Sequence, residues 1–364
     1  MSVKFARATE FHRELKDRVA SYFESASKPP RGLPRMYVKS AIILAWFSAS
    51  YALLVFAADT WWIAIGLAIS LALAAAAIGM DIQHDGSHGG YSDSKLVNGI
   101  AASTLDLIGG SSYLWRWKHN VLHHSFTNID GADDDINIGP LGRLSPEQPR
   151  YRFHRFQYIY MWPLYGFVAL KWQLFDDFKE LARGKVGSRV VPKPRGMQLA
   201  VFIGGKIAFV LMAFIIPVLF HPFWLVVAFY CLVAMTIGIV LGVVFQMAHC
   251  VEEADFPVPA ESSNRIEDEW AVHQASTTVN FARRNKLLTW YIGGLNYQIE
   301  HHLFPKICHL HYPKLSPIVE SVCGKFGVKY EANASLHSAM ASHLRWLRRM
   351  GRPEGNGEAL PHTA

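Results

Sequence analysis

The sequence predicts an all-α integral membrane protein with four transmembrane helices in two hairpins and a cytoplasmic helical cap that carries a histidine-rich site. Two observations lead to this fold class. Four long segments are almost free of charge, and three short histidine clusters follow hydrophobic stretches. Of the 364 residues, 51% are hydrophobic, and they are segregated along the chain rather than evenly spread. A soluble fold would distribute them over shorter amphipathic elements.

Each of the four apolar segments is long enough to cross the hydrocarbon core of a bilayer, which takes about 20 helical residues. They cover residues 38–58, 62–80, 198–220 and 223–247. The third segment contains a single charged residue, Lys206. Core helices of soluble proteins are usually shorter and amphipathic. We therefore expect all four segments to span the membrane.

The charges around these segments predict their orientation. The links at 59–61 and 221–222 carry no Lys or Arg, whereas residues 1–39 carry nine. The positive-inside rule therefore places both termini and the large middle region in the cytoplasm, as in a multi-pass protein of a bacterial-type inner membrane. The net charge of +7 follows from this asymmetry and fits anionic lipid at the cytoplasmic face. Because the basic residues are spread over loops, they do not form the stripe typical of nucleic-acid binding.

The chain is expected to divide into a cytoplasmic N-terminal segment, a membrane domain, and a C-terminal helix with a tail, at residues 1–37, 38–330 and 331–364. Residues 351–364 of the tail are expected to be disordered. Two further segments look membrane-associated without spanning. Residues 95–114 are moderately apolar, and residues 156–175 are aromatic and interrupted by Pro163. We place both at the lipid–water interface, where aromatic side chains are enriched. A fifth span over 156–175 is the competing interpretation.

Three histidine clusters predict a metal site. They are His84-Asp-Gly-Ser-His88, His119-Asn-Val-Leu-His123-His124 and Gln298-Ile-Glu-His301-His302. Imidazole suits iron, zinc and copper at neutral pH. Seven histidines exceed the four ligands of a tetrahedral zinc and match two metals of higher coordination number. Residues four apart share one face of a helix, so we expect His84 to point with His88 and His119 with His123.

The predicted topology brings all three clusters to one side of the membrane, where a single centre could gather them. His249, at the cytoplasmic end of the fourth span, is a further candidate ligand, because ionisable groups at such positions are usually functional or paired. His273 is a candidate ninth ligand, or a residue that orients the ligands. His309 and His311 follow the third cluster, and we expect them to shape the site rather than to bind metal.

Polar residues near the clusters are expected to orient the imidazoles through hydrogen bonds. The candidates are Asp85, Asn120, Asn128, Asp133, Asp134, Asp135 and Glu300. A solvated acidic loop or a helix cap is the alternative interpretation of the three consecutive aspartates. The four cysteines contain no C-x-x-C motif, which argues against a disulfide framework, a thiolate metal site and iron–sulfur clusters. Histidine with carboxylates and amides fits iron that carries out dioxygen chemistry.

The motifs H-x3-H, H-x3-H-H and Q-x2-H-H, set around four spans, resemble those of the membrane fatty acid desaturases. The resemblance extends beyond the clusters. His123-His-Ser-Phe-Thr-Asn128, followed by three aspartates, is similar to the second-box context of that family. Gly293-Gly-Leu-Asn-Tyr-Gln-Ile-Glu-His-His-Leu-Phe-Pro305 is similar to the third-box context of its front-end branch, which includes bacterial linoleoyl-CoA desaturase-like proteins. The similarity covers residues 35–330.

The resemblance implies a non-haem centre of two iron ions. Carried over residue by residue, its ligands are His84, His88, His119, His123, His124, His249, His301 and His302. Gln298 departs from the third histidine found in many members and is the usual residue in front-end enzymes, which act between an existing double bond and the carboxyl end. A neutral amide is a weaker ligand than imidazole. Gln298 would therefore bind through water or leave a position open, for which His273 is a candidate.

The resemblance also implies the reaction, a cis double bond introduced into a fatty acyl chain linked to CoA or to lipid, with delta-5/delta-6-like selectivity. Dioxygen is the co-substrate, and each turnover needs two external electrons. The printed sequence has no His-Pro-Gly-Gly motif of a fused cytochrome b5 domain, so we expect a separate ferredoxin or cytochrome b5-like donor with its reductase. An apolar tunnel should reach the metals from the membrane. Its candidate wall residues are Trp115, Trp117, Trp270 and Trp290, for which interface anchoring is the alternative.

Three other functions compete with this interpretation. The same scaffold could support hydroxylation, epoxidation or acetylenic bond formation, because only the fate of the substrate radical differs. A membrane metal transporter or haem protein would use paired histidines within its spans, whereas here the clusters follow the span ends. A purely structural membrane scaffold would leave the clusters without a role.

Overall fold

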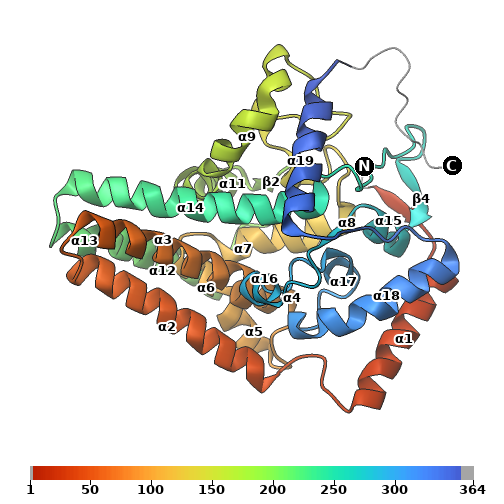
Figure 1. Cartoon of the computed structure of the whole chain (residues 1–364), viewed down its shortest axis with the longest axis horizontal. Coiled ribbons are helices and arrows are strands. Elements are labelled where there is room, and N and C mark those ends of the chain that lie inside the picture. The colour runs from red at the N-terminus through yellow and green to blue at the C-terminus, as the bar shows by residue number, and fades with distance from the viewer. Residues whose placement is uncertain (1–2, 354–364) are drawn as a thin grey trace.

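The computed structural model describes residues 3–353, which form an array of helices with three minimal sheets of two strands each (Figure 1). Four helical stretches are long and apolar enough to cross a membrane, which confirms the predicted segments. They are α2 (Pro34–Phe56), α3 (Trp61–Ala77), α12 (Met197–Val210) extended through η7 (Leu211–Ile215) and α13 (Ile216–Val218), and α14 (Phe223–His249).

Two of these spans run further than the sequence predicted. α3 passes without a break through the π-helical turn η1 (Ile78–Gln83) into α4 (His84–His88), so the second span and the first histidine cluster form one helical rod. α14 likewise ends at His249. Because the histidines lie on the same helices as the spans, the membrane helices themselves position part of the site.

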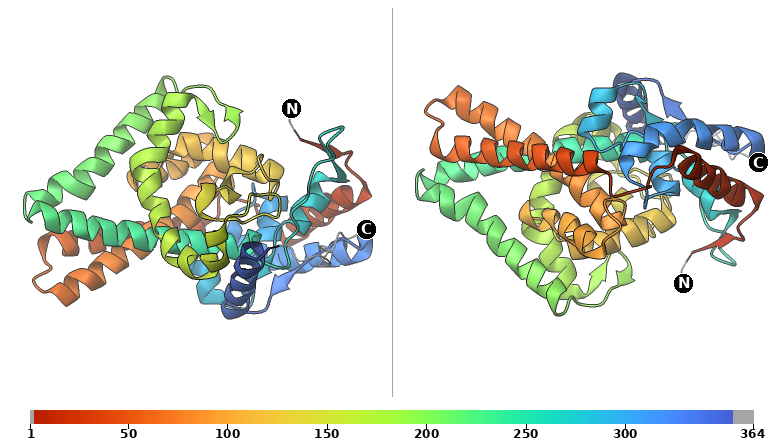
Figure 2. Two further views of the ribbon diagram at one scale, coloured as in Figure 1. Left: turned by 90° about the horizontal axis from the view of Figure 1, so that it is seen from above. Right: turned by 90° about the horizontal axis from the view of Figure 1, so that it is seen from below.

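The two hairpins pack through α3, which contacts both α2 and α14. The C-terminal half of α3, which leads to the first histidine cluster, is rich in small residues, and Ala68, Ala72 and Ala74–Ala77 are all buried. Small residues let helix backbones approach closely, which drives packing of helices in lipid. The outer faces of the spans remain apolar and exposed, as at Trp62 (84% exposed) and Phe223 (65% exposed), which is what contact with lipid requires. Figure 2 shows both hairpins leading away from the cap on one side.

The first part of the cap, between the second and third spans, consists of short helices. They are α5 (Lys95–Ala102), α6 (Thr104–Leu107), α7 (Ser112–Trp115), η2 (Arg116–His123), α8 (His124–Phe126), η3 (Asp134–Ile136), η4 (Gly139–Leu141), η5 (Arg152–Phe156), α9 (Gln157–Tyr165), α10 (Phe167–Lys171), η6 (Trp172–Asp176) and α11 (Asp177–Arg183). Neither of the two segments predicted at the interface is one long helix. Among the described residues only four stretches qualify as spans, and 156–175 is not one of them.

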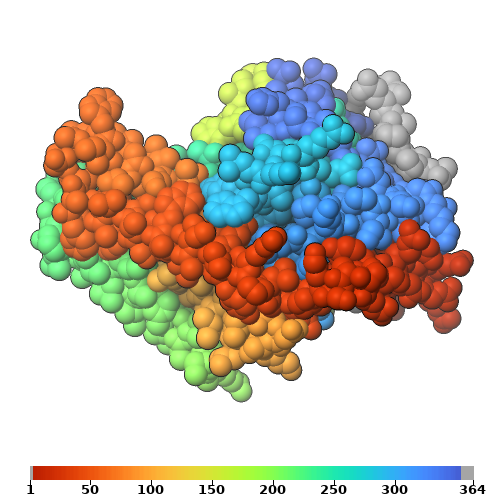
Figure 3. All heavy atoms as spheres, turned by 60° about the horizontal axis from the view of Figure 1, so that its bottom comes forward, coloured from red at the N-terminus to blue at the C-terminus, as the bar shows by residue number. Residues whose placement is uncertain are grey.

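The second part of the cap follows α14. It contains α15 (Trp270–Ser276), α16 (Lys286–Tyr291), α17 (Gln298–Leu303), η8 (His309–His311), α18 (Tyr312–Phe326) and α19 (Leu336–Gly351). The N-terminal helix α1 (Glu10–Ala26) packs Phe11 and Leu15 against Val319 and Val322 of α18. Figure 3 shows α1 in dark red running along this part of the cap.

Short strands tie distant parts of the chain together. β1 (Lys4–Ala6) pairs in parallel with β4 (Arg265–Glu269), β5 (Asn280–Phe281) pairs in parallel with β6 (Ala332–Asn333), and β2 (Lys185–Val186) forms a hairpin with β3 (Arg189–Val190). The first two pairs attach the N-terminal segment and the C-terminal helix to the region that carries the site.

The predicted C-terminal helix is α19, and it packs on the membrane helix α14. His343 connects the two, because its Nδ1 lies 2.6 Å from the carbonyl oxygen of Cys250 and its Nε2 lies 2.7 Å from the Tyr165 hydroxyl. The predicted disordered tail begins at 351, yet Gly351 still belongs to the helix and is buried. Residues 354–364 of that tail lie outside the described residues.

Candidate metal centre

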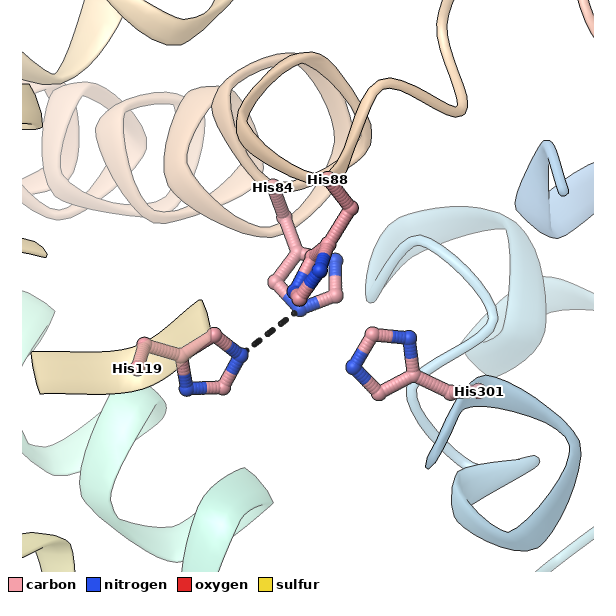
Figure 4. Close-up of side chains that lie close together, drawn as sticks. All are labelled: His84, His88, His119 and His301. Atoms are coloured by element: carbon pink, nitrogen blue, oxygen red, sulfur yellow. Dashed lines mark hydrogen bonds between the residues drawn. The ribbon is translucent and has the colours of Figure 1, made fainter. Parts of the chain in front are cut away.

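The three histidine clusters meet in one buried region between the spans and the cap. Four rings converge there from three separate elements, as Figure 4 shows. His84 and His88 come from α4, His119 from η2 and His301 from α17, and their ligand atoms all lie within 4.8 Å of one another. We call these four histidines group 1. The Nε2 atoms of His84 and His119 are 3.3 Å apart.

A second set of histidines gathers beside the first. His123, His249 and His302, from η2, α14 and α17, also bring their ligand atoms within 4.8 Å. We call them group 2. His124 lies between the groups: it gathers with His301 and His302. Its Nε2 is 3.0 Å from that of His301 and 3.3 Å from that of His119. All eight candidate histidine ligands are therefore brought together.

The spacing of these nitrogens fits metal binding. Two nitrogens bound at about 2.1 Å to one ion lie roughly 3.0–3.4 Å apart at angles between octahedral and tetrahedral. The facing Nε2 atoms are 3.0–3.3 Å apart. In addition, Nε2 of His88, His123 and His302 and Nδ1 of His249 are buried without a hydrogen-bond partner among the described residues. Burial of unsatisfied polar atoms is costly, so a bound cation would account for them.

A π-helix explains how one short segment serves both groups. The second cluster lies on η2 and its continuation, where the backbone repeats after about five residues rather than four. His119 is thereby aligned with His124, five residues on, and their Nε2 atoms face each other at 3.3 Å. His123 turns instead toward His249 and His302. The rings of His119 and His123 still lie side by side, with centroids 5.2 Å apart and Asp135 beside both. They nevertheless contribute to different histidine groups.

Acidic residues after the second cluster hold its histidines. The buried Asp133 carboxylate lies 2.9 Å from Nδ1 of His123 and accepts backbone N–H bonds from Asn128 and Asp135. Asp135 Oδ2 lies 3.5 Å from Nδ1 of His119. Asp134 faces Lys118 instead. A carboxylate at Nδ1 leaves Nε2 free for a metal, as the orphaned Nε2 of His123 indicates.

Asn128 braces the same loop against α14. Its backbone is left-handed (φ 59°), a conformation that asparagine tolerates better than most residues. Its side-chain amide donates to the carbonyls of His249, Asp255 and Thr277. The amide thus fixes the end of the fourth span, where His249 lies, relative to the second cluster.

Gln274 was missed from the sequence. Its Oε1 lies 2.7 Å from Nδ1 of His302 and accepts a 3.0 Å bond from the Thr127 hydroxyl, and the glutamine is fully buried. Gln274 thus orients His302 as Asp133 orients His123. Only its position beside His273 could have drawn attention to it, because a neutral glutamine outside the three clusters gives no other signal.

We expect Gln274→Leu to weaken iron binding by about 10- to 100-fold, the usual effect of removing a partner that orients a ligand. The leucine cannot accept a hydrogen bond from Nδ1–H of His302, so the ring loses its fixed orientation. Iron retained after dialysis against a graded chelator series would measure the change. Gln274→Glu is the matched control, because it keeps an acceptor oxygen at that position. Unchanged iron retention in the leucine variant would show that Gln274 does not orient the ligand.

Burial also prepares the cap histidines for metal. It lowers the pKa of His124, His301 and His302 well below the ordinary histidine value, with neighbouring imidazoles adding to the effect. The three rings are therefore neutral at pH 7, the form that binds metal. His123 differs. Burial disfavours its charge, yet the Asp133 carboxylate raises the pKa of His123 above its ordinary value, which makes the ring a stronger base.

Asp85 and Glu300 contact other groups than the histidine ligands. Asp85 Oδ2 lies 2.8 Å from Nδ1 of His309, and Lys39 Nζ lies 2.9 Å from Nε2 of the same ring. Lys39 in turn forms a buried ion pair with Asp81. These contacts join His309 of η8 to the helices of the first two spans. Glu300 accepts from Asn280 and from the Tyr330 hydroxyl, which fixes the start of α17.

Asn120 and His311 have similarly local roles. The Asn120 amide donates to the Ser87 carbonyl and so joins η2 to α4. Nε2 of His311 lies 3.0 Å from the Pro29 carbonyl oxygen, away from both groups. Neither His309 nor His311 belongs to group 1 or group 2, although His309 gathers with Asp85 and Cys308.

Gln298 and His273 are buried near the site without joining either group. Gln298 begins α17, and its side chain forms no hydrogen bond with any described residue. His273 packs against Phe5, with ring centroids 4.9 Å apart, and belongs to none of the histidine groups found among the described residues.

An apolar cavity of about 290 Å³ lies between the two hairpins. All four spans contribute to its wall, for example through Tyr51, Leu71, Phe209 and Phe229. None of the four candidate tunnel tryptophans lines it. The cavity reaches Ile108, which shares a core cluster with Trp115.

The four tryptophans lie elsewhere. Trp115 stacks on His119 of group 1 with ring centroids 4.7 Å apart, and it also packs in the core cluster of Ile108, a residue of the cavity wall. Trp270 donates its indole N–H to the His124 carbonyl. Trp117 packs in the cluster around Leu114, and Trp290 is 38% exposed with Lys39 over its ring.

Several known proteins are similar in sequence to this chain over most of its length. Residues 59–334 match the family described as fatty acid desaturase. The chain is 41% identical to an sn-1 linoleoyl-lipid 6-desaturase of Arthrospira platensis, covering 96% of this chain and 94% of that one. It is 38% identical to an sn-1 linoleoyl-lipid 6-desaturase of Synechocystis sp. (96% and 98% covered) and 37% identical to an acyl-lipid (8-3)-desaturase of Physcomitrium patens (96% and 75% covered). With its four membrane helices and its converging histidine boxes, the chain belongs to the fatty acid desaturase family and is a membrane oxidoreductase that introduces double bonds into fatty acyl chains.

Proposed function

We propose that this enzyme is a front-end acyl-lipid desaturase that introduces a cis double bond near the carboxyl end of a lipid-linked chain, with position 6 as the first candidate. The observation that carries the proposal is the near full-length similarity to two sn-1 linoleoyl-lipid 6-desaturases. Gln298 at the head of the third cluster supports the same branch. Lipid linkage is favoured over acyl-CoA because the two relatives are named for lipid substrates.

Two iron ions are the proposed cofactor. Group 1 would hold one ion and group 2 the other, with His124 placed to serve either. When bound, the metals would supply the activation of dioxygen that side-chain acid–base chemistry cannot provide. The protein's own part is to present neutral imidazoles in a fixed orientation. Asp133 and Gln274 do this for His123 and His302.

The surroundings of the metals exclude water. All eight histidines are buried, with at most 8% of any side chain exposed. Exclusion of water protects a reactive centre from side reactions and strengthens its electrostatic interactions. A buried site of this kind suits the oxidation of an unactivated methylene group.

The apolar cavity is proposed as the site of the methyl-end half of the acyl chain. It follows α3 from Trp61 to Ala75, and Ala75 lies nine residues before His84 on the same helical rod. At 1.5 Å per residue the cavity therefore extends along about 21 Å of helix and ends roughly 13 Å from the first ligand. A front-end enzyme leaves most of its chain beyond the new double bond, and that part needs an apolar site.

We expect Ala64→Phe to discriminate against long chains, because Ala64 lines the outer half of the cavity. Turnover of 18-carbon chains should fall by at least about tenfold, the effect of losing a single methylene contact in an apolar pocket. Shorter chains that stop before this position should keep most of their turnover. Product ratios by gas chromatography would measure the difference. Ile63→Phe, on the exposed face of the same helix, is the matched control. Equal loss for every chain length would argue against this site.

Electrons are proposed to come from a separate ferredoxin or cytochrome b5-like protein and its reductase. We also propose a bacterial-type inner membrane, with both termini and the metal centre on the cytoplasmic side, and residues 38–330 as the membrane domain. The positive-inside charge distribution supports this orientation. A reporter fused to either terminus would test it.

Expression in a host of defined lipid composition tests the function directly. We expect a new cis double bond at position 6 of 18-carbon chains already unsaturated further along, found mainly in glycerolipid rather than in acyl-CoA. Mass spectrometry of the double-bond position in each lipid class would measure this. A hydroxylated or epoxidised chain without a new alkene would establish the competing reaction on the same scaffold. A double bond found first in acyl-CoA would refute the lipid-linked substrate.

A further inference from the structure

A cluster of arginines occupies the outer end of the cap, where η5 meets the last turn of α19. Six arginines of these two segments are exposed, and one of them, Arg345, pairs with Glu252. We call the other five, Arg152, Arg155, Arg348, Arg349 and Arg352, the arginine face. None of the five forms an ion pair with any residue that the structure describes. Segments 141–160 and 345–353 contain eight arginines and a single acidic residue, Glu147. The face therefore carries a strong and unneutralised positive charge.

The arginine face is rigidly built. Gly351 packs so closely on η5 that a Cβ there would lie 2.2 Å from the His154 carbonyl oxygen. Arg150 donates to the Gly351 carbonyl at 3.0 Å, and Gln157 donates to the Leu347 carbonyl at 2.9 Å. These contacts hold the two segments together, so the exposed guanidinium groups share one surface.

Large apolar side chains emerge beside these charges. Tyr151, Phe153, Phe156 and Ile159 are 44%, 45%, 47% and 58% exposed. They lie at the start of η5, on η5 and on α9, and α9 packs against the membrane span α14. The last residue of α9, Tyr165, packs on Gly242 of α14. Figure 1 shows α9 and α19 side by side, projecting outward from α14.

We propose that the arginine face binds the headgroups of anionic phospholipids while the adjoining aromatic side chains enter the membrane interface. Guanidinium groups pair with phosphate through two parallel hydrogen bonds. Clusters of four to eight basic residues next to membrane segments are typical of anionic-lipid binding, and aromatic residues favour the same interface. An acidic protein would satisfy the charges, but it would leave Phe153, Phe156 and Ile159 without an apolar partner so close to a span.

The test uses the full-length protein in mixed micelles of phosphatidylglycerol and phosphatidylcholine. Native mass spectrometry would give the ratio of the two lipids that stay bound. We expect the triple variant R152Q/R348Q/R349Q to lower this ratio by at least about fivefold, the contribution of a single basic residue near an anionic surface. R13Q/K16Q/R18Q is the matched control, because it removes three exposed charges from α1 at another part of the cap. It should leave the ratio unchanged.

Two further results decide the proposal. Should the triple variant not fold, raising the salt concentration with the wild-type protein replaces it, since screening should lower the preference for phosphatidylglycerol. An unchanged lipid ratio in the variant, or a wild-type preference that salt does not affect, overturns the proposal. If the ratio is unchanged while turnover with a soluble electron donor falls, the face docks an acidic protein and the lipid assignment is wrong.

Discussion

We expect the replacement of His123 with alanine to abolish desaturation while the protein stays folded in the membrane. His123 belongs to group 2, which contains three histidines, so the variant would offer that metal two. The loss should exceed the 10- to 100-fold typical of residues that merely orient a ligand. Bound iron should fall by about half, because the group 1 histidines remain. Product analysis and metal analysis of the purified protein would measure the two effects.

The fold should survive this substitution. Asp133 loses its contact with the imidazole but keeps the backbone N–H bonds from Asn128 and Asp135, so the loop after the second cluster stays anchored. His337→Ala is the matched control, because His337 is exposed on α19 and distant from both groups. It should retain both iron ions and full activity. Retained desaturation in His123→Ala would remove His123 from the proposed ligands.

The membrane helices and the ligand histidines are predictable because each depends on local composition. A helix of about 20 apolar residues matches the thickness of the bilayer's hydrocarbon core, so such a run predicts a membrane span. Histidines at helical spacing past the end of such a run are rarely explained by packing alone. Both signals are confined to short stretches, and the four spans and the gathering of all eight histidines agree with them.

The division of the histidines into two groups could not be predicted in the same way. It depends on η2 being a π-helix, and a π-helix forms only where tertiary contacts favour an extra residue in the turn. In this turn His119 faces His124, five residues on, whereas His123, four residues on, joins group 2. Sequence spacing alone would have placed them by the α-helical repeat.

Hydrogen-bond partners that lie far apart in the sequence also could not be predicted. Asp85 neighbours His84 in the chain, yet its carboxylate contacts His309, 224 residues away. Gln274 orients His302 although it lies outside every cluster. Such pairs form when separate segments of the cap fold over the metal helices, and no local pattern records them. The contact between the acidic loop and the second cluster could be predicted, because Asp133 is only ten residues from His123 in the chain.

Within the third cluster, His301→Ala should be far more damaging than Gln298→Ala. His301 belongs to group 1, and its Nε2 lies 3.0 Å from that of His124, so its loss disturbs both groups. Activity should fall by more than about 100-fold, beyond the effect of losing a partner that orients a ligand. Gln298 forms no side-chain hydrogen bond with the described residues, and an amide oxygen is a poorer iron ligand than imidazole. Its removal should cost less than about tenfold in activity.

Iron content distinguishes the two roles more sharply than activity does. His301→Ala should lose iron, whereas Gln298→Ala should retain both ions and change mainly the rate. Gln298→His provides the control, because it restores the three-histidine form of the third box without adding charge, and it should keep its iron. If Gln298→Ala loses as much iron and activity as His301→Ala, the glutamine is a ligand of full weight. Group 2, with three histidines, would then be the group with room for it, since Gln298 lies one turn before His302 on α17.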